Sequence, residues 1–319
     1  MPKSAKKLIK LAAGFAVSVV LLLLLFSRID TEAVPEVIAK ARPGFLFASI
    51  ACSLSVNVLL SAVQWKIALD ALGLHLSLRE NAFIKVALYP LRLIVPAKAG
   101  DLTRAAYLSV QHGFPAALGI GLTFFVTLGN MVVLLVLAMI GAVFAGIDGP
   151  LFFAIAATVG AGCVIVYAVL RWRYRTGRIP ERLLPFRPVF LLPLRTVSTI
   201  FAFGAIGLFV HLFTFWFILL SLRIEPPFAF AMTATPLVYI AGNLPLTFMG
   251  IGTREAAVSM LFAQYANATN LLSAGLLLTL IDKLLSVAVG LFFFPRFAAA
   301  CIPPKTKEKK PQRVTDKSS

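Results

Sequence analysis

Two short segments, far apart in the chain, combine helix-breaking residues with charges that could bind an anion. The first is VPAKAGDLTRAAYL (residues 95–108) and the second is LPLTFMGIGTREAAVSM (residues 244–260). Each has proline, then glycine, then a Thr-Arg pair that leads into small residues. A helix that begins at such a break presents free backbone N–H groups and the positive end of its dipole, which together favour an anion. An adjacent arginine can hold a phosphate through two parallel hydrogen bonds.

In the second segment, Gly250 and Gly252 let the backbone turn, and Thr253 is expected to cap the helix that follows. Arg254 is then the cation of the anion site. Glu255 is adjacent to Arg254 and does not face it on a helix, so the two are expected to have different partners. Glu255 could neutralise the arginine of the first segment, bind a cationic headgroup or carry a proton. It could also simply stabilise the first helical turn.

The first segment contains the same parts. Pro96 and Gly100 break the chain, Asp101 or Thr103 is expected to cap the next helix, and Arg104 is the cation. Two such sites facing each other near the middle of a membrane would suit a phospholipid or polyprenyl-phosphate headgroup. Ionisable residues inside a membrane are functional by default, and structural pairing is the main alternative.

Other polar residues are weaker candidates. Asp282 and Lys283 lie in a later apolar run and could form a transport pair or join helices, although their adjacency argues against direct pairing. The histidines have no metal-like spacing, and His211 lies alone in an apolar run, so neither a metal nor a cofactor is expected. Four amide side chains are expected to hydrogen-bond between helices: Asn57, Gln64, Asn130 and Asn243.

The composition places these residues inside a membrane. Of 319 residues, 60% are hydrophobic and 13% charged, and the mean hydropathy is +0.92. A soluble domain could not bury this much apolar surface, and the runs are too long and continuous for a β-barrel. The net charge of +17 comes from basic residues beside apolar runs, so anionic lipid and not nucleic acid is the expected partner. An all-α polytopic membrane protein is predicted.

Six apolar runs are long enough to cross the bilayer as helices. Basic residues gather near the N-terminus, in residues 171–195 and in the C-terminal tail, which predicts that both chain ends are cytoplasmic. The first run has no clear cleavage site and is expected to be an uncleaved span. The expected spans are Leu8–Ser27, Pro43–Val63, Ala116–Ala145, Leu151–Leu170, Ser198–Leu222 and Leu271–Phe294.

Two further apolar stretches, Ala82–Pro96 and Phe228–Phe248, are short or broken by Pro and Gly. If either crossed completely, the basic segments would lie on the wrong side. Each is therefore predicted to be a re-entrant hairpin, the first dipping in from the cytoplasm and the second from outside. Three spans and one hairpin then recur with opposite orientation, as in many transporters. The expected repeats, 1–146 and 150–295, form one membrane domain, and the basic tail 296–319 is expected to be disordered.

The motifs PxKAGDxxR (96–104) and GIGxREA (250–256) resemble those of the membrane region of lysylphosphatidylglycerol synthases and of related stand-alone flippase-like proteins. The resemblance covers approximately residues 8–295. It implies a helical bundle in a bacterial or archaeal cytoplasmic membrane that moves, or helps to modify, a lipid or lipid-linked headgroup. Asp101 stands where the family usually has Glu. The positions that match are Pro96, Gly100, Arg104, Gly250, Gly252 and Glu255.

The chain departs from this family pattern in two places. An acidic cluster common in the next span is replaced by TFFVTLGNMV (123–132), which offers Asn130. An arginine common near the start of the last span is replaced by Asp282 and Lys283. Any ion-coupling role of those family positions is therefore open. The soluble aminoacyl-transferase domain of the full synthases is not in this sequence, so the chain is not expected to make lysyl-lipid alone.

The leading functional hypothesis is a translocator of a phospholipid or a lipid-linked headgroup. A membrane-embedded headgroup or glycosyl transferase, with Glu255 or Asp101 as a base, is the first alternative. The second is a scaffold in an envelope-assembly complex, and partners from envelope biosynthesis fit any of the three. No phosphate-binding Gly-Lys-Ser/Thr loop is present, so ATP-driven pumping would need a partner protein.

Overall fold

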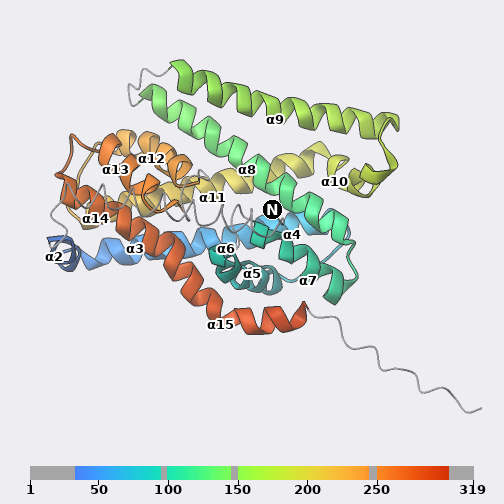
Figure 1. Ribbon diagram of the computed structural model, residues 1–319, viewed down its shortest axis with the longest axis horizontal. Helices are drawn as coiled ribbons and strands as arrows, with labels where there is room; N and C mark the ends of the chain where they lie inside the picture. The colour runs from blue at the N-terminus through green and yellow to red at the C-terminus, as the bar shows by residue number, and fades with distance from the viewer. Residues whose placement is uncertain (1–32, 95–98, 145–149, 244–249, 302–319) are drawn as a thin grey trace, which may run out of the picture.

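Every regular element in the described part of the protein is a helix (Figure 1). The computed structural model describes residues 33–94, 99–144, 150–243 and 250–301. In chain order the elements are α2 (Ala33–Ala39), α3 (Pro43–Leu54), η1 (Ser55–Leu60), α4 (Ser61–Asp70), α5 (Leu78–Ala87), α6 (Tyr89–Ile94), η2 (Ala99–Leu102), α7 (Thr103–His112), α8 (Ala116–Phe144), α9 (Pro150–Thr176), η3 (Glu181–Phe186), α10 (Arg187–Phe190), α11 (Leu194–Ser221), α12 (Phe228–Asn243), α13 (Thr253–Leu261), α14 (Ala268–Thr279), η5 (Leu280–Leu284) and α15 (Leu285–Ala300).

Five continuous helical segments in the described residues are long and apolar enough to cross a membrane. They correspond to the last five expected spans, and the first, Leu8–Ser27, lies outside the described residues. The chain is therefore an all-α polytopic membrane protein, as predicted. The five segments are Pro43–Asp70, Ala116–Phe144, Phe153–Thr176, Leu194–Ser221 and Ala268–Ala300.

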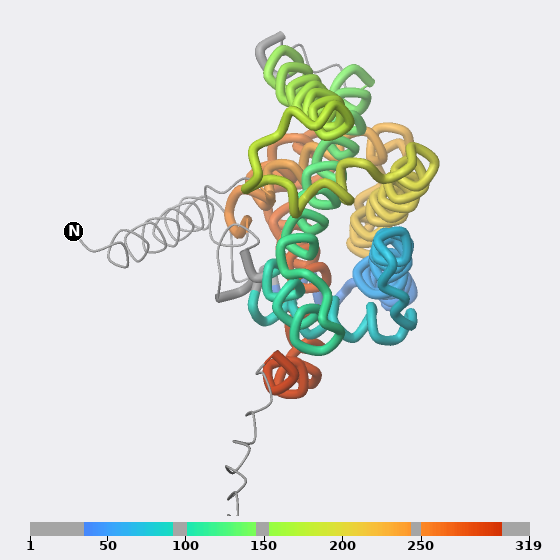
Figure 2. The backbone as a smooth tube through the Cα atoms, turned by 90° about the vertical axis from the view of Figure 1, so that its right-hand side faces the viewer, coloured from blue at the N-terminus to red at the C-terminus, as the bar shows by residue number. Residues whose placement is uncertain are grey.

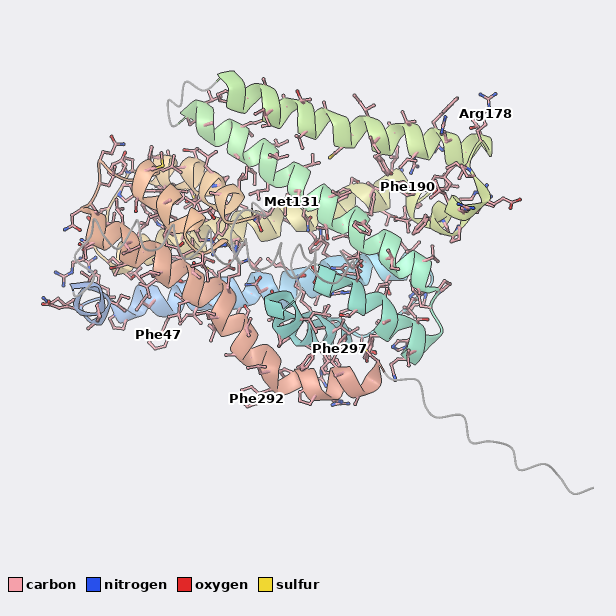
Figure 3. All side chains as sticks on the ribbon, in the orientation of Figure 1. Phe47, Met131, Arg178, Phe190, Phe292 and Phe297 are labelled. Atoms are coloured by element: carbon pink, nitrogen blue, oxygen red, sulfur yellow. The ribbon has the colours of Figure 1, made fainter. Side chains whose placement is uncertain are left out.

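The surface of α9 shows why these segments need lipid around them. Val164, Ile165 and Val166 are 56%, 60% and 57% exposed, although successive residues point in different directions around a helix. A helix whose exposed surface is apolar on all sides is suited to hydrocarbon and not to water. In lipid, a helix also satisfies its backbone hydrogen bonds internally. Phe47 on α3 and Phe292 on α15 also project outward (Figure 3). In two perpendicular views, α9 lies at one edge of the bundle and the end of α15 at the opposite edge (Figure 2).

The element order occurs twice, about 150 residues apart. A long helix (α3–η1–α4, then α11) is followed by a short helical segment (α5–α6, then α12), a second short helix (α7, then α13) and another long helix (α8, then α14–η5–α15). The second short helices begin at Thr103 and Thr253, 150 positions apart. In Figure 1, α3–α4 and α11 run in opposite directions along the long axis. This is the arrangement that an inverted repeat requires, and its orientation relative to a membrane stays a prediction.

The two halves exchange contacts. The last helix of the first half, α8, packs on α12, and the last helix of the second, α15, packs on α5 and α6. Each contact depends on a glycine. A Cβ added at Gly141 would lie 1.7 Å from the Thr233 carbonyl oxygen, and one at Gly290 would lie 2.6 Å from the Val86 carbonyl oxygen. Small residues let membrane helices approach this closely.

The short helices differ in length from a membrane span. With 16 residues, α12 extends about 24 Å, whereas the hydrocarbon core is about 30 Å thick. The chain also breaks between α5, with 10 residues, and α6, with 6. Both described helical segments are shorter than the hydrocarbon core is thick, and their re-entrant character stays a prediction.

The end of α15 is joined to the first half. This helix continues to Ala300, past the expected domain boundary at residue 295, and buried Phe297 stacks on Tyr107 with ring centroids 5.3 Å apart. The Tyr107 hydroxyl donates to Glu80 over 3.1 Å. Burial, reinforced by the Glu80 carboxylate, raises the pKa of Tyr107 to about 12, so its hydroxyl stays protonated and remains a donor. Residues 302–319 of the expected tail lie outside the described residues.

Candidate functional site

The start of α13 is a tight turn packed on α12. Gly250 and Gly252 have φ of +79° and +93°, which side chains other than glycine rarely adopt. A Cβ at Gly250 would lie 2.1 Å from the carbonyl oxygen of Gly242 in α12. The two glycines therefore make the turn, as predicted, and bring the first residues of α13 against α12. Pro245 and the other residues of 244–249 lie outside the described residues.

Glu255 holds this helix start together. Its Oε2 accepts the Gly252 N–H over 2.6 Å, and its Oε1 accepts the Thr279 hydroxyl over 2.7 Å. The side chain is fully buried. Both carboxylate oxygens thus have donors within the protein, which favours the structural alternative for Glu255 over neutralisation of Arg104.

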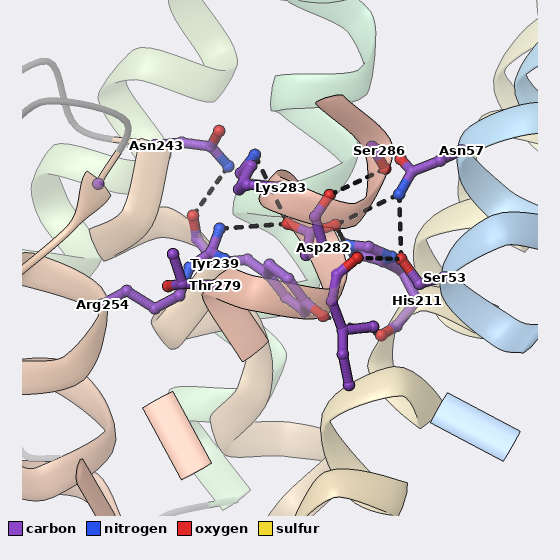
Figure 4. Close-up of polar contacts among 12 residues, drawn as sticks. Ser53, Asn57, His211, Tyr239, Asn243, Arg254, Thr279, Asp282, Lys283 and Ser286 are labelled. Atoms are coloured by element: carbon purple, nitrogen blue, oxygen red, sulfur yellow. Dashed lines mark hydrogen bonds and ion pairs between the residues drawn. The ribbon is translucent and has the colours of Figure 1, made fainter. Parts of the chain in front are cut away.

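Arg254 points away from Glu255, and the two have different partners, as expected from their adjacency. The Arg254 side chain is 1% exposed, and its Nη2 lies 3.4 Å from Asp282 Oδ2 (Figure 4). The guanidinium carbon also lies 5.7 Å from the centroid of the Tyr239 ring. Gly242 makes room for it, because a Cβ there would be 2.6 Å from Arg254 Nε. Among the described residues, Nε, Nη1 and Nη2 of Arg254 have no hydrogen-bond partner.

Asp282 is the centre of the charged cluster. It is 4% exposed and belongs to η5, a π-helical turn between α14 and α15. Its Oδ2 also lies 3.5 Å from Lys283 Nζ, and its Oδ1 lies 3.1 Å from His211 Nε2 (Figure 4). Such π-helical turns are rare and often occur at functional sites. We call Arg254, Asp282, Lys283 and His211 the Asp282 cluster.

A second π-helical turn faces the first. Asn57 lies in η1, and its Nδ2 donates to Asp282 Oδ1 over 3.4 Å and to Ser53 Oγ over 3.2 Å. Ser53 in turn donates to the Ile281 carbonyl over 3.5 Å. The first and last spanning segments are therefore joined at the Asp282 cluster by polar contacts.

His211 is enclosed by Tyr239. The two ring centroids are 4.5 Å apart, and the Tyr239 hydroxyl donates to the His211 carbonyl over 3.0 Å. His211 Nδ1 is buried and has no hydrogen-bond partner in the described part of the chain. A protonated His211 would bury an unsatisfied N–H at this atom, so the neutral form with its proton on Nε2 fits the structure.

The first half holds Arg104 in a different way. Arg104 is 2% exposed, and its guanidinium carbon lies 3.7 Å from the centroid of the Trp65 ring. Asp101, in η2, is also buried. On α6, the Tyr89 hydroxyl donates to the Asn57 carbonyl over 3.4 Å. Tyr89 is thus placed like Tyr239, 150 positions later, which donates to a carbonyl of the neighbouring long helix. Gly100 lies in η2, and Pro96 lies outside the described residues.

Two expectations about helix caps are corrected. Gly252 and not Thr253 is the N-cap of α13, and the Thr253 hydroxyl instead donates to the Gly250 carbonyl over 3.1 Å. Leu102 occupies the N-cap position of α7, so neither Asp101 nor Thr103 does. In each case the N-cap lies one residue away from the expected position, because the local backbone conformation decides where the backbone hydrogen bonds of the helix begin.

Two further expectations concern the last span and α11. Asp282 and Lys283 do form an ion pair, although adjacency argued against it. The local π-helical turn changes the angle between successive side chains, and the long lysine side chain can bend back. His211 lies alone in the apolar part of its own span, as the sequence indicated, but its ring contacts Asp282 of η5, which lies 71 positions later in the chain. This proximity depends on helix packing.

The predicted role of the amide side chains is confirmed in α4 and α8. Gln64 Nε2 donates to Asn130 Oδ1 over 2.9 Å and to the Ile200 carbonyl over 3.0 Å, and Asn130 Nδ2 donates back to Gln64 Oε1 over 3.3 Å. A Cβ at Gly204 would lie 2.4 Å from Asn130 Oδ1. These amides join three spanning helices. Asn243 instead donates within its own helix, to the Tyr239 carbonyl over 2.8 Å.

Sequence reasoning missed His211 and Tyr239. The one available signal was a polar aromatic residue in the middle of an otherwise apolar run, and such a signal does not name a partner. Chemically, the cluster is a buried carboxylate that accepts contacts from three basic side chains. In this arrangement Asp282 offsets the buried positive charge of Arg254 and the partly buried positive charge of Lys283.

Comparison with known proteins agrees with the helical architecture. A family model described as the lysylphosphatidylglycerol synthase TM region matches residues 11–290. No curated protein matches the chain. The match includes all the candidate site residues, from Pro96 to Lys283.

Proposed function

Because the chain belongs to the family of lysylphosphatidylglycerol synthase TM regions, we propose that it moves an anionic phospholipid or lipid-linked headgroup across the membrane. The headgroup phosphate binds at Arg254, where α13 begins, and a second site at Arg104 lies at the equivalent position of the first half. The family supports a membrane protein of this kind, and the transport activity is our inference from the buried charges.

The observation that carries the proposal is that the buried guanidinium of Arg254 lacks hydrogen-bond partners among the described residues. Its guanidinium is buried, yet three of its nitrogens have no hydrogen-bond partner among the described residues, and its ion pair with Asp282 is long, at 3.4 Å. A buried guanidinium normally has its donors satisfied, because an unmet donor costs roughly 1–3 kcal/mol or more. A phosphate has oxygens in the fork geometry that this side chain binds best.

Two features of the fold support movement of the bound group. The repeated element order places short helices and chain breaks in both halves, and broken helices at a repeat interface hold the substrate in many transporters. The Asp282 cluster joins segments from both halves through Asn57, so a change at the headgroup site would be felt by both. The first site contains Arg104, Asp101 and Gly100, and the second site contains Arg254, Thr253, Gly250 and Gly252.

Reconstitution of the purified chain into liposomes tests this function. Vesicles carry a phosphatidylglycerol labelled on one acyl chain, and a membrane-impermeant reductant quenches the label in the outer leaflet only. The chain is expected to make the inner-leaflet label accessible, and Arg254→Gln is expected to slow this by about tenfold or more, equivalent to about 1.4 kcal/mol. Arg175→Gln, the same change at an exposed arginine, is the matched control.

Three results would count against the proposal. Equal rates with and without the protein would exclude lipid movement under these conditions. Equal rates for Arg254→Gln and Arg175→Gln would exclude the site. Release or exchange of the headgroup, detected by mass spectrometry of the recovered lipid, would instead support a membrane-embedded transferase.

A further inference from the structure

We propose that binding of the headgroup anion at Arg254 is coupled to uptake of one proton by His211. This inference rests on the proposed function, because it concerns the same site and names what regulates it. The geometric basis is the contact of His211 Nε2 with Asp282 Oδ1 at 3.1 Å and of Arg254 Nη2 with Asp282 Oδ2 at 3.4 Å. One carboxylate thus joins the headgroup-binding cation to a titratable ring.

The charges in and beside the cluster balance when His211 is neutral. Arg254 and Lys283 are positive, and Asp282 and Glu255 are negative. Glu255 belongs to the same balance because its Oε1 is bound by Thr279, less than one turn before Asp282. The unpartnered, buried Nδ1 of His211 independently favours the neutral ring.

An arriving phosphodiester upsets this balance. It adds one negative charge beside Asp282, which is 4% exposed, and like charges repel strongly where they are buried. Protonation of His211 at Nδ1 restores neutrality, and the imidazolium then faces a carboxylate that Arg254 no longer fully occupies. This gain in charge balance outweighs the cost of the buried N–H that protonation creates at Nδ1. Histidine is the side chain whose charge changes most readily near neutral pH, so it is the member of the cluster best suited to take up a proton.

Few other groups can take this proton. On the elements packed around α11, the other titratable side chains in the described residues are Tyr239 on α12, Cys52 on α3, and Lys66 and Asp70 on α4, which pair with each other over 2.9 Å. The helices α8 and α14 have none. Arg104 and Asp101 of the first half carry opposite charges and leave the sum unchanged.

The sign of the pH dependence follows from the proton count. Binding that takes up a proton becomes tighter as pH falls between the His211 midpoint of the bound chain and that of the free chain, by at most about tenfold per pH unit, and is level outside that window. Dihexanoyl phosphatidylglycerol is a suitable probe because its single charge does not change between about pH 5 and 8. Its affinity for the purified chain in neutral nanodiscs is measured across that range by isothermal titration calorimetry. Buffers with different ionisation enthalpies give the proton uptake directly.

The variants separate this coupling from binding itself. His211→Gln is expected to bind the probe with little pH dependence. Glu255→Gln keeps His211 but removes one negative charge, so it is also expected to flatten the dependence. Glu36→Gln, which removes an exposed carboxylate of α2, is expected to keep the slope of the native chain.

The protonation of His211 can also be measured directly, without a substitution in the site. The chain has three histidines, so the double variant His75→Gln/His112→Gln carries only His211. Its ¹⁵N imidazole signals report protonation at each nitrogen, and addition of the probe is expected to raise the titration midpoint of the ring by about one pH unit or more.

The outcomes are distinct. Binding that gains no affinity at low pH, or a His211 midpoint that the probe does not move, overturns the coupling and leaves the proposed function standing. Absence of probe binding at every pH overturns both. A steep pH dependence that persists in His211→Gln assigns the proton to another group and also refutes the proposal.

Discussion

Asn57 and Asp282 face each other from two π-helical turns, with Asn57 Nδ2 3.4 Å from Asp282 Oδ1. The turns interrupt the first and last described spanning segments at the same depth of the bundle. A π-helical turn widens the helix and redirects side chains, so each interruption turns a polar group inward that a regular helix would place elsewhere. The Asp282 cluster lies where these two irregular turns meet.

The fit of Arg254 against α12 gives the first prediction. In Gly242→Ala, the added Cβ would lie 2.6 Å from Arg254 Nε, so the guanidinium must move away from its position beside Asp282. Lipid transport is expected to fall by on the order of tenfold, and the melting temperature is expected to fall less than in Arg254→Gln, because the positive charge stays in the site. Gly160→Ala in α9 is the control, since a Cβ there meets nothing within 4 Å. Equal transport by the two variants would contradict the assignment.

A second prediction concerns the role of Glu255 in stability. Thr279→Val preserves side-chain shape but removes the hydroxyl that donates to Glu255 Oε1 over 2.7 Å. A buried carboxylate oxygen then lacks a donor, and we expect a loss of about 1–3 kcal/mol in unfolding free energy, measured by denaturant titration in detergent. Thr235→Val is matched to it, because the buried Thr235 hydroxyl bonds only a carbonyl of its own helix in the described contacts. A loss no larger than that of Thr235→Val would show that Glu255 does not depend on Thr279.

The third prediction tests whether Arg254 and Asp282 depend on each other. Arg254→Gln removes one of the positive charges that offset the buried carboxylate of Asp282, and Asp282→Asn leaves Arg254 without its ion pair. Each single change is therefore expected to lower the free energy of unfolding by roughly 3–5 kcal/mol. The double variant removes both charges and should be less destabilised than the sum of the singles. Thermal unfolding of the four proteins gives the coupling energy. The same cycle at the exposed Glu36–Lys40 pair is expected to show no measurable coupling, and additive effects at Arg254 and Asp282 would argue against their interaction.

The fourth prediction concerns orientation. His75 and Glu225 lie in the equivalent loops after α4 and α11, and their side chains are 76% and 64% exposed. In a chain whose three native cysteines are replaced by serine, a cysteine at position 75 is expected to react with an impermeant maleimide only from the cytoplasmic side. A cysteine at position 225 is expected to react only from outside. Labelling of both from one side would exclude the inverted repeat.

Much of the architecture could be predicted from the chain alone. Long apolar runs must become helices in a membrane, because no other single-segment structure satisfies the backbone there, and the described runs are helical as expected. The turn at Gly250 and Gly252 was also predictable, since positive φ is a local property of glycine. Helix limits were less accurate, and α3–η1–α4 reaches Asp70 rather than Val63.

The candidate site shows the division between sequence and tertiary structure. The sequence predicted that Arg104, Arg254 and Asp282 are charges among the apolar segments of a membrane protein, because long apolar runs surround them, and the structure shows all three buried. Only the folded chain decided that His211 pairs with Asp282 and that Gly242 makes room for Arg254. These contacts join residues that are far apart in sequence, and helix packing, which depends on small residues and irregular turns in several segments at once, sets their distances. A local pattern can identify a charge that needs a partner, but the three-dimensional arrangement selects which partner it has.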